Sequence, residues 1–66
     1  MRKTVTLGTY MKVQKYFDSN PNKSFNKTFL RDNLNIDFYS LTIILNELMK
    51  GNFIRLKDKE YKLQGN

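Results

Sequence analysis

The first third of the chain carries large apolar residues at a helical spacing. Positions i, i+3, i+4 and i+7 form one stripe with a single polar member: Leu7, Tyr10, Met11, Gln14 and Phe17. The stripe predicts a helix over residues 7–17 that faces the core with this side. Thr6 can cap its start, and the breaker-rich run Asp-Ser-Asn-Pro-Asn at 18–22 predicts its end. Residues 1–6 are then left as a flexible or extended arm.

A second, shorter helix is predicted over residues 27–34. Asn26 is a suitable N-cap, and the apolar residues expected to face inward are Phe29, Leu30 and Leu34. Ser24 and Phe25 form only a brief link before it, and the pattern leaves open whether this link is a strand.

The next turn and the third helix have clear boundary residues. Asn35 can close the preceding helix in the left-handed conformation, and Asp37 can cap the next one. Gly51, a residue favoured just past a helix end, predicts that the third helix covers residues 38–50. At 100° per residue, its inward face is expected to hold Phe38, Leu41, Ile44, Leu45, Leu48 and Met49. Its outward face is expected to hold Tyr39, Thr42, Ile43, Asn46 and Lys50.

The last segment changes from a helical period to a period of two. Inward apolar positions alternate with polar ones, and they are Ile54, Leu56, Tyr61 and Leu63. A two-residue turn at Asp58-Lys59 puts residues of the same kind opposite one another, in the pairs Lys57–Glu60, Leu56–Tyr61 and Arg55–Lys62. This register predicts a half-buried hairpin.

This order of elements resembles the winged helix-turn-helix family. The resemblance lies in the run LNIDFYSLTIILNELMKGNFIRLKDKEYKL, residues 34–63, which is similar to a short helix, a tight turn, a recognition helix ending in Leu-x-x-Leu-x-x-Gly, and a β-wing. Leu45, Leu48 and Gly51 occupy that ending. The resemblance implies a mainly α, α+β fold: a three-helix winged helix-turn-helix with a C-terminal β-hairpin wing, as a single domain over residues 1–66.

The charge of the chain changes the range of partners to consider. Twelve Lys and Arg residues against six Asp and Glu residues give a net charge of +6 over 66 residues. Such a field suits a polyanion such as nucleic acid. The alternative is that lysine simply keeps a small domain soluble.

Several functional classes are not expected. The chain has no Cys and no His, which removes disulfides, zinc-finger and His-based metal sites and the usual nucleophile pairs. No apolar run approaches the roughly 20 residues of a membrane span. We therefore expect a non-enzymatic protein without cofactor or membrane partner, located in the cytoplasm and associated with the nucleoid if prokaryotic or viral.

The resemblance also implies double-stranded DNA binding, by a small transcriptional regulator or replication accessory factor. Helix 38–50 would enter the major groove and wing 53–64 would contact the backbone. The implied base contacts are Tyr39, Thr42, Ile43, Asn46 and Lys50. Asn46 could pair with adenine, and Thr42 and Ile43 could pack on thymine methyls, which would favour A·T-rich sites.

Cations on the wing and the second helix are the implied backbone contacts: Lys27, Arg31, Arg55, Lys57, Lys59 and Lys62, with Arg2 and Lys3 able to flank them. Arg55 and Lys62 would be like charges directly opposite each other, an arrangement that a phosphate would relieve. The alternative is a solvated edge hairpin whose lysines prevent aggregation.

Two further interpretations concern protein partners. Tyr39 and Ile43, with Tyr16 in addition, could instead form a contact for another protein, as in a small subunit or a phage-type inhibitor. A single exposed Ile also needs no special explanation.

A homodimer is expected as well, because one module makes few base contacts, and its predicted surface is Tyr10, Val13 and Tyr16 on the first helix.

Overall fold

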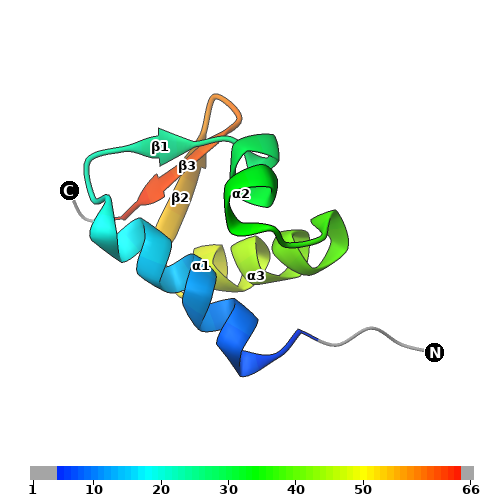
Figure 1. The fold of residues 1–66 in the computed structure, drawn as a ribbon. Coiled ribbons are helices and arrows are strands. Elements are labelled where there is room, and N and C mark those ends of the chain that lie inside the picture. The colour runs from blue at the N-terminus through cyan, green and yellow to red at the C-terminus, as the bar shows by residue number, and fades with distance from the viewer. Residues whose placement is uncertain (1–4, 65–66) are drawn as a thin grey trace.

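The computed structural model describes residues 5–64 and contains three helices and three short strands. In chain order the elements are α1 (Leu7–Ser19), β1 (Ser24–Phe25), α2 (Lys27–Leu34), α3 (Phe38–Lys50), β2 (Ile54–Lys57) and β3 (Glu60–Leu63). The strands form one antiparallel sheet in the order β1-β3-β2 beside the helices (Figure 1). This is the mainly helical α+β, winged-helix-like fold that the sequence predicts.

Each helix begins at the cap residue that the sequence predicts. The backbone N–H of Thr9 donates to Thr6 Oγ1 at 3.2 Å, and that of Phe29 donates to Asn26 Oδ1 at 2.7 Å. The N–H of Ser40 donates to Asp37 Oδ2 at 3.0 Å. These side chains satisfy N–H groups that a helix start leaves without a backbone partner.

The ends of α2 and α3 agree with prediction in place, whereas α1 runs to Ser19, two residues past its predicted end. Asn35 closes α2 in the left-handed conformation, with φ 54°. After α3, however, Gly51 has φ −83° and the left-handed residue is Asn52, with φ 60°. The Phe53 N–H reaches back to the Leu48 carbonyl at 2.9 Å, which is the bond of a Schellman motif. Asn52 therefore adopts the left-handed conformation that is expected of Gly51.

The hairpin has the predicted register. Arg55 lies opposite Lys62, Leu56 opposite Tyr61, and Lys57 opposite Glu60. Asp58 and Lys59 both have positive φ, 52° and 66°, the conformation of a type I′ turn that matches the twist of paired strands. The link Ser24–Phe25 is a strand, because Ser24 pairs with Lys62 and Phe25 with Tyr61.

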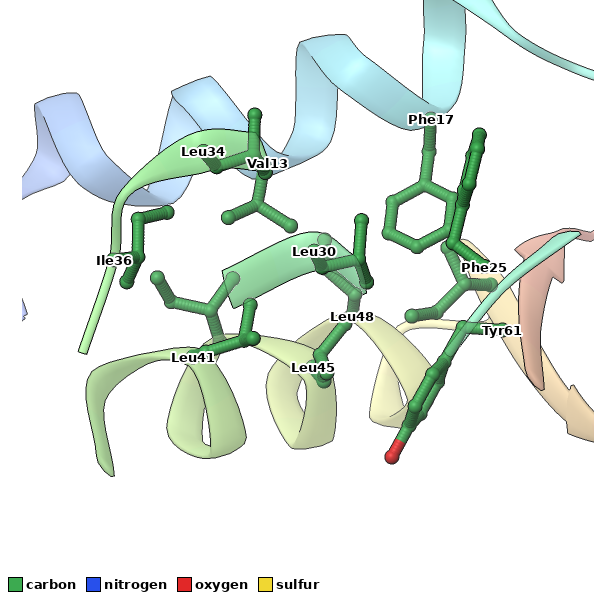
Figure 2. Close-up of a cluster of buried hydrophobic side chains, with 12 residues drawn as sticks. Val13, Phe17, Phe25, Leu30, Leu34, Ile36, Leu41, Leu45, Leu48 and Tyr61 are labelled. Atoms are coloured by element: carbon green, nitrogen blue, oxygen red, sulfur yellow. The ribbon is translucent and has the colours of Figure 1, made fainter. Parts of the chain in front are cut away.

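The hydrophobic core lies between the helices and the inner face of the sheet. In Figure 2, Val13 and Phe17 of α1 lie on one side and Leu41, Leu45 and Leu48 of α3 on the other. The remaining buried apolar residues come from the strands, α2, α3 and the α2–α3 turn: Phe25, Leu30, Leu34, Ile36, Ile44, Ile54 and Tyr61. Burying this set of side chains is the main force that holds so short a chain together.

The predicted inward stripe of α1 is wrong by a rotation of the helix. Leu7 is 73% exposed and Met11 is 46% exposed, whereas Val13 is fully buried beside Phe17. The predicted stripe contains Gln14, whose amide would have to be buried with it at a cost in free energy. Rotation to the face that includes Val13 and Phe17 moves Gln14 from the middle of the buried face to its border, where it is half-buried like Tyr10 and Tyr16.

Three other residues predicted to face inward are partly exposed: Phe29 at 39%, Phe38 at 45% and Leu56 at 49%. The ring of Phe29 stacks on Phe25 with centroids 5.2 Å apart. Leu56 lies on the edge strand β2, opposite Tyr61 and in the same row of the sheet as Phe25.

Candidate nucleic-acid interface

The outward face of α3, defined by Tyr39, Thr42, Ile43, Asn46 and Lys50, has an exposed centre and partly covered sides. Tyr39 is 55% exposed, and Asn46 and Lys50 are exposed. Thr42 and Ile43 are only half-exposed. Nothing in the described chain covers the middle of this face, so a partner could contact Tyr39, Asn46 and Lys50 together.

Thr42 differs from the other members of this face because its hydroxyl already has a partner. Its Oγ1 donates to the carbonyl of Phe38, one turn earlier, at 2.9 Å. The hydroxyl proton is therefore committed to the helix itself. The methyl group and an oxygen lone pair are what Thr42 can offer a partner, which suits an apolar contact with a thymine methyl.

The side of α3 that faces α2 is cationic. Lys27 Nζ lies 5.3 Å from the centroid of the Phe38 ring, and Arg31 Cζ lies 5.4 Å from it. We call Lys27, Arg31 and Phe38 the α2 flank. Two cations that the family resemblance implies as backbone contacts are thus brought together beside the first residue of α3. The sequence pattern misses Phe38 as their neighbour, because the contact depends on how α2 packs against α3.

The opposite side of α3 is apolar and carries an acid. Leu7 and Tyr10 from α1 line a hollow with Ile43 and Glu47 from α3, and we call these four residues the α1 flank. Glu47 is the acidic residue of α3 and is exposed. A polyanion is therefore favoured on the α2 flank and disfavoured on the α1 flank.

The outer face of the sheet carries the wing cations. Because side chains alternate along a strand, Arg55 and Lys57 of β2 share this face with Lys62 of β3 and Ser24 of β1. Glu60 lies on it as well and accepts a hydrogen bond from Ser24 Oγ at 3.0 Å. The sequence analysis pairs Glu60 with Lys57 but gives it no part in the site, although its position two residues before Lys62 is a readable signal. Lys59 is exposed in the turn.

Of the three residues predicted to form a dimer surface, one is buried and two are half-buried. Val13 lies in the core with no exposed surface, so its assignment to that surface is wrong. Tyr10 and Tyr16 are half-buried against the core, and the Tyr16 ring lies 5.0 Å from that of Phe25. The exposed apolar residues of α1 are Leu7 and Met11 instead.

Two of the predicted flanking cations lie outside the described residues, and within those residues the structure can be searched for membrane helices and metal ligands. Arg2, Lys3 and the rest of residues 1–4 are outside the described part of the chain. Within residues 5–64, no helix has the length and apolar character needed to cross a membrane. No group of three or more acidic, His or Cys side chains gathers there as a metal site would require.

Burial changes the acidity of Tyr61, whose ring lies on the inner face of the sheet. The Tyr61 ring packs in the core, with its hydroxyl directed away from the cluster (Figure 2). Burial raises the pKa of Tyr61, because the phenolate would lose its hydration.

Comparison of the chain with protein-family models, with curated proteins and with solved structures finds no match in any of the three. The functional argument therefore depends on the fold and on the side chains described above.

Proposed function

We propose that this protein binds double-stranded DNA, with α3 in the major groove and the β2–β3 wing on the backbone. As a small basic module without an evident catalytic group, it would act as a regulator of transcription or an accessory factor of replication. The winged-helix-like fold supports the proposal at the level of architecture, and the charges of specific residues support it at the level of the site.

The observation that carries the proposal is the pair formed by Arg55 and Lys62. They are like charges directly opposite each other on neighbouring strands, which is unfavourable, and the carboxylate on the same face, Glu60, lies opposite Lys57 and accepts from Ser24. Protection of a sheet edge could explain Arg55 on β2, which is an edge strand. It does not explain Lys62, which is paired on both sides, with Ser24 and with Arg55. A phosphate group lying over both cations accounts for the pair.

Base reading would come from the outward face of α3. Asn46 is exposed and carries the amide that can pair with the N6 and N7 atoms of adenine. The Thr42 methyl and Ile43 would contact thymine methyls, while Tyr39 would reach a phosphate. This set of contacts favours A·T-rich sites.

The test is fluorescence anisotropy of a labelled A·T-rich duplex of about 25 base pairs, long enough for two half-sites, measured at several salt concentrations. We expect the logarithm of the affinity to fall steeply and linearly with the logarithm of salt concentration. Replacing both Arg55 and Lys62 with Ala should reduce the slope by roughly 0.9 for each phosphate that the variant no longer neutralises.

The matched control is Lys12→Ala with Lys15→Ala, which removes the same charge from the exposed side of α1. It should leave the slope nearly unchanged. Equal effects from the two double variants would show that only net charge matters. No binding at low salt would refute the proposal.

A second candidate function is a protein-interaction module, such as a small subunit or a phage-type inhibitor. The observation that favours it is the α1 flank, where Ile43 lines an apolar hollow with Leu7 and Tyr10, next to exposed Tyr39. This function would require Tyr39 and Ile43 whatever the charge of the wing. If Ile43→Ser abolishes the biological function of the protein while replacement of Arg55 and Lys62 with Ala leaves that function intact, the protein-interaction function is favoured over DNA binding.

We also propose that two copies pair on DNA, since specific sites are commonly two half-sites. The exposed apolar residues Leu7 and Met11 are the α1 residues that could take part. Light scattering of the protein with its duplex should give a mass for two chains of 7.9 kDa each. A Leu7→Ser and Met11→Ser variant should bind as one chain; a single wild-type chain per duplex would refute the pairing.

A further inference from the structure

We propose that Lys27, Arg31 and Phe38 form one binding site for a single phosphate group, with the Phe38 ring as the residue that positions both cations. The inference builds on the proposed function, in which this phosphate belongs to the DNA backbone. It goes further in assigning one phosphate to two cations and a role to an aromatic residue that does not itself contact the phosphate.

The first argument is geometric. Lys27 Nζ and Arg31 Cζ lie 5.3 Å and 5.4 Å from the same ring centroid, within the range of a cation–π interaction. The two cations come from one turn of α2, and the ring comes from the first residue of α3. Packing of α2 on α3 therefore fixes where the two charges meet.

The second argument is energetic. Lys27 and Arg31 are four residues apart on a helix, where like charges destabilise each other. Phe38 is 45% exposed, which is unfavourable for an apolar ring. Contact with the ring offsets part of both costs in the free protein, and an anion between the cations would offset the rest.

The third argument is that both cations keep donors for a ligand. Arg31 Nε donates to Asp32 Oδ1 at 3.2 Å, which orients the guanidinium and leaves its two terminal Nη groups. Lys27 makes no ion pair with any carboxylate of residues 5–64. A phosphate has several oxygens that can accept from both groups at once, whereas the planar pair of oxygens in a carboxylate fits the Arg31 fork alone.

One phosphate shared by two cations predicts a particular salt dependence. Each neutralised phosphate contributes roughly 0.9 to the slope of log affinity against log salt. Lys27→Ala or Arg31→Ala alone should therefore lower the slope by less than this amount, because the remaining cation still holds the phosphate. The double variant should lower it by roughly 0.9, where two separate phosphates would give twice that change.

The role of Phe38 is tested by Phe38→Leu, which keeps every charge. If the ring holds the two side chains in place, its removal adds the cost of ordering them to binding, which lowers duplex affinity about fivefold while the salt slope stays the same. The matched control is Phe29→Leu on α2, because Phe29 is also a partly exposed ring but stacks on Phe25 instead of lying under a cation. It should leave the affinity within about twofold of the wild type.

The site is also tested without DNA, by NMR titration of the wild-type protein with inorganic phosphate. The Arg31 Hε and Phe38 ring resonances should shift together on one binding curve, and Lys27→Ala should weaken that curve, whereas Lys15→Ala should not. Absence of this joint shift would overturn the proposal.

The two tests separate the two proposals. If phosphate shifts these resonances but the wild-type chain does not bind the duplex, DNA binding fails and the phosphate site stands. If the duplex binds but Phe38→Leu has the affinity of the wild type, or the slope of the double variant falls by the amount expected for two phosphates, the site proposed here is wrong and DNA binding stands.

Discussion

The two flanks of α3 offer a partner opposite chemistry although they border the same helix. On the α2 flank, Lys27 and Arg31 lie over the ring of Phe38. On the α1 flank, Glu47 lines an apolar hollow together with Leu7 and Tyr10. The exposed residues Tyr39, Asn46 and Lys50 lie between the two.

This difference indicates how a partner would sit on the molecule. A DNA duplex that lies on the outward face of α3 and tilts toward α2 brings its phosphates close to Lys27 and Arg31. A duplex that tilts toward α1 meets the negative charge of Glu47 instead. A protein that uses Ile43 buries more apolar area by leaning toward α1. The net charge of +6 alone does not make this distinction, because it does not say where the charge lies.

The largest effect is expected from a core substitution in α3, because both flanks depend on the position of this helix. Leu45 holds α3 in the core and has no exposed surface, so Leu45→Ala should lower the free energy of unfolding by about 2–5 kcal/mol. The control is Leu7→Ala, which should change stability by less than about 0.5 kcal/mol because Leu7 is 73% exposed. Urea denaturation followed by circular dichroism measures both, and equal effects would contradict the observed rotation of α1.

Reversing one charge on each flank tests their difference directly. Arg31→Glu should weaken duplex binding by about 1.5–3 kcal/mol, since it replaces a charge-assisted contact with a repulsive one. Glu47→Lys should strengthen binding by less than about 1 kcal/mol, the scale of an exposed charge. Anisotropy titrations of the two variants at one salt concentration would reveal the asymmetry. Opposite effects of the same size would instead mean that DNA lies centrally over α3.

Asn46 tests the residues between the flanks. If its amide pairs with adenine, Asn46→Ala should reduce discrimination between matched and mismatched sites by about 1–3 kcal/mol. The salt slope should not change, because the same phosphates are still neutralised. Competition binding with duplexes that differ at one base pair measures this. An equal drop in affinity for every sequence would assign Asn46 to the backbone.

The smallest effect concerns Tyr61 of β3 and is a change in stability at high pH. Because burial raises the pKa of Tyr61, the unfolded chain loses this proton first as the pH rises. The contribution to stability is complete below about pH 10 and is lost as the pH rises through the higher pKa of the folded protein. Tyr61→Phe should therefore be less sensitive to alkali than the wild type when unfolding is measured at several pH values. Equal sensitivity would mean that the phenol is hydrated in the folded protein.

Local signals in the sequence predict most of this fold. The caps Thr6, Asn26 and Asp37 and the hairpin register depend on residues close in sequence, and they agree with the structure. The buried face of α1 could not be predicted in the same way. Two apolar faces compete on that helix, and tertiary packing selects the one with Val13.

The candidate site was predictable only in part. Which residues of α3 point outward follows from helical period, and Tyr39, Asn46 and Lys50 are exposed as expected. That Lys27 and Arg31 meet at Phe38 depends on the approach of α2 to α3, which no local pattern encodes. The same holds for the pairing of Lys62 on both sides, since it requires β1 to join the sheet.

The most direct test of the account is to map the chemical shifts of the backbone amides while an A·T-rich duplex is added to the labelled protein. We expect the largest changes at Lys27 and Arg31 of α2, along the outward face of α3, and at Arg55 and Lys62 of the wing. Leu7, Tyr10 and Glu47 should change little. Changes that gather on the α1 flank, or a spectrum that the duplex does not alter, would contradict the claim that DNA lies against α3 on its α2 side.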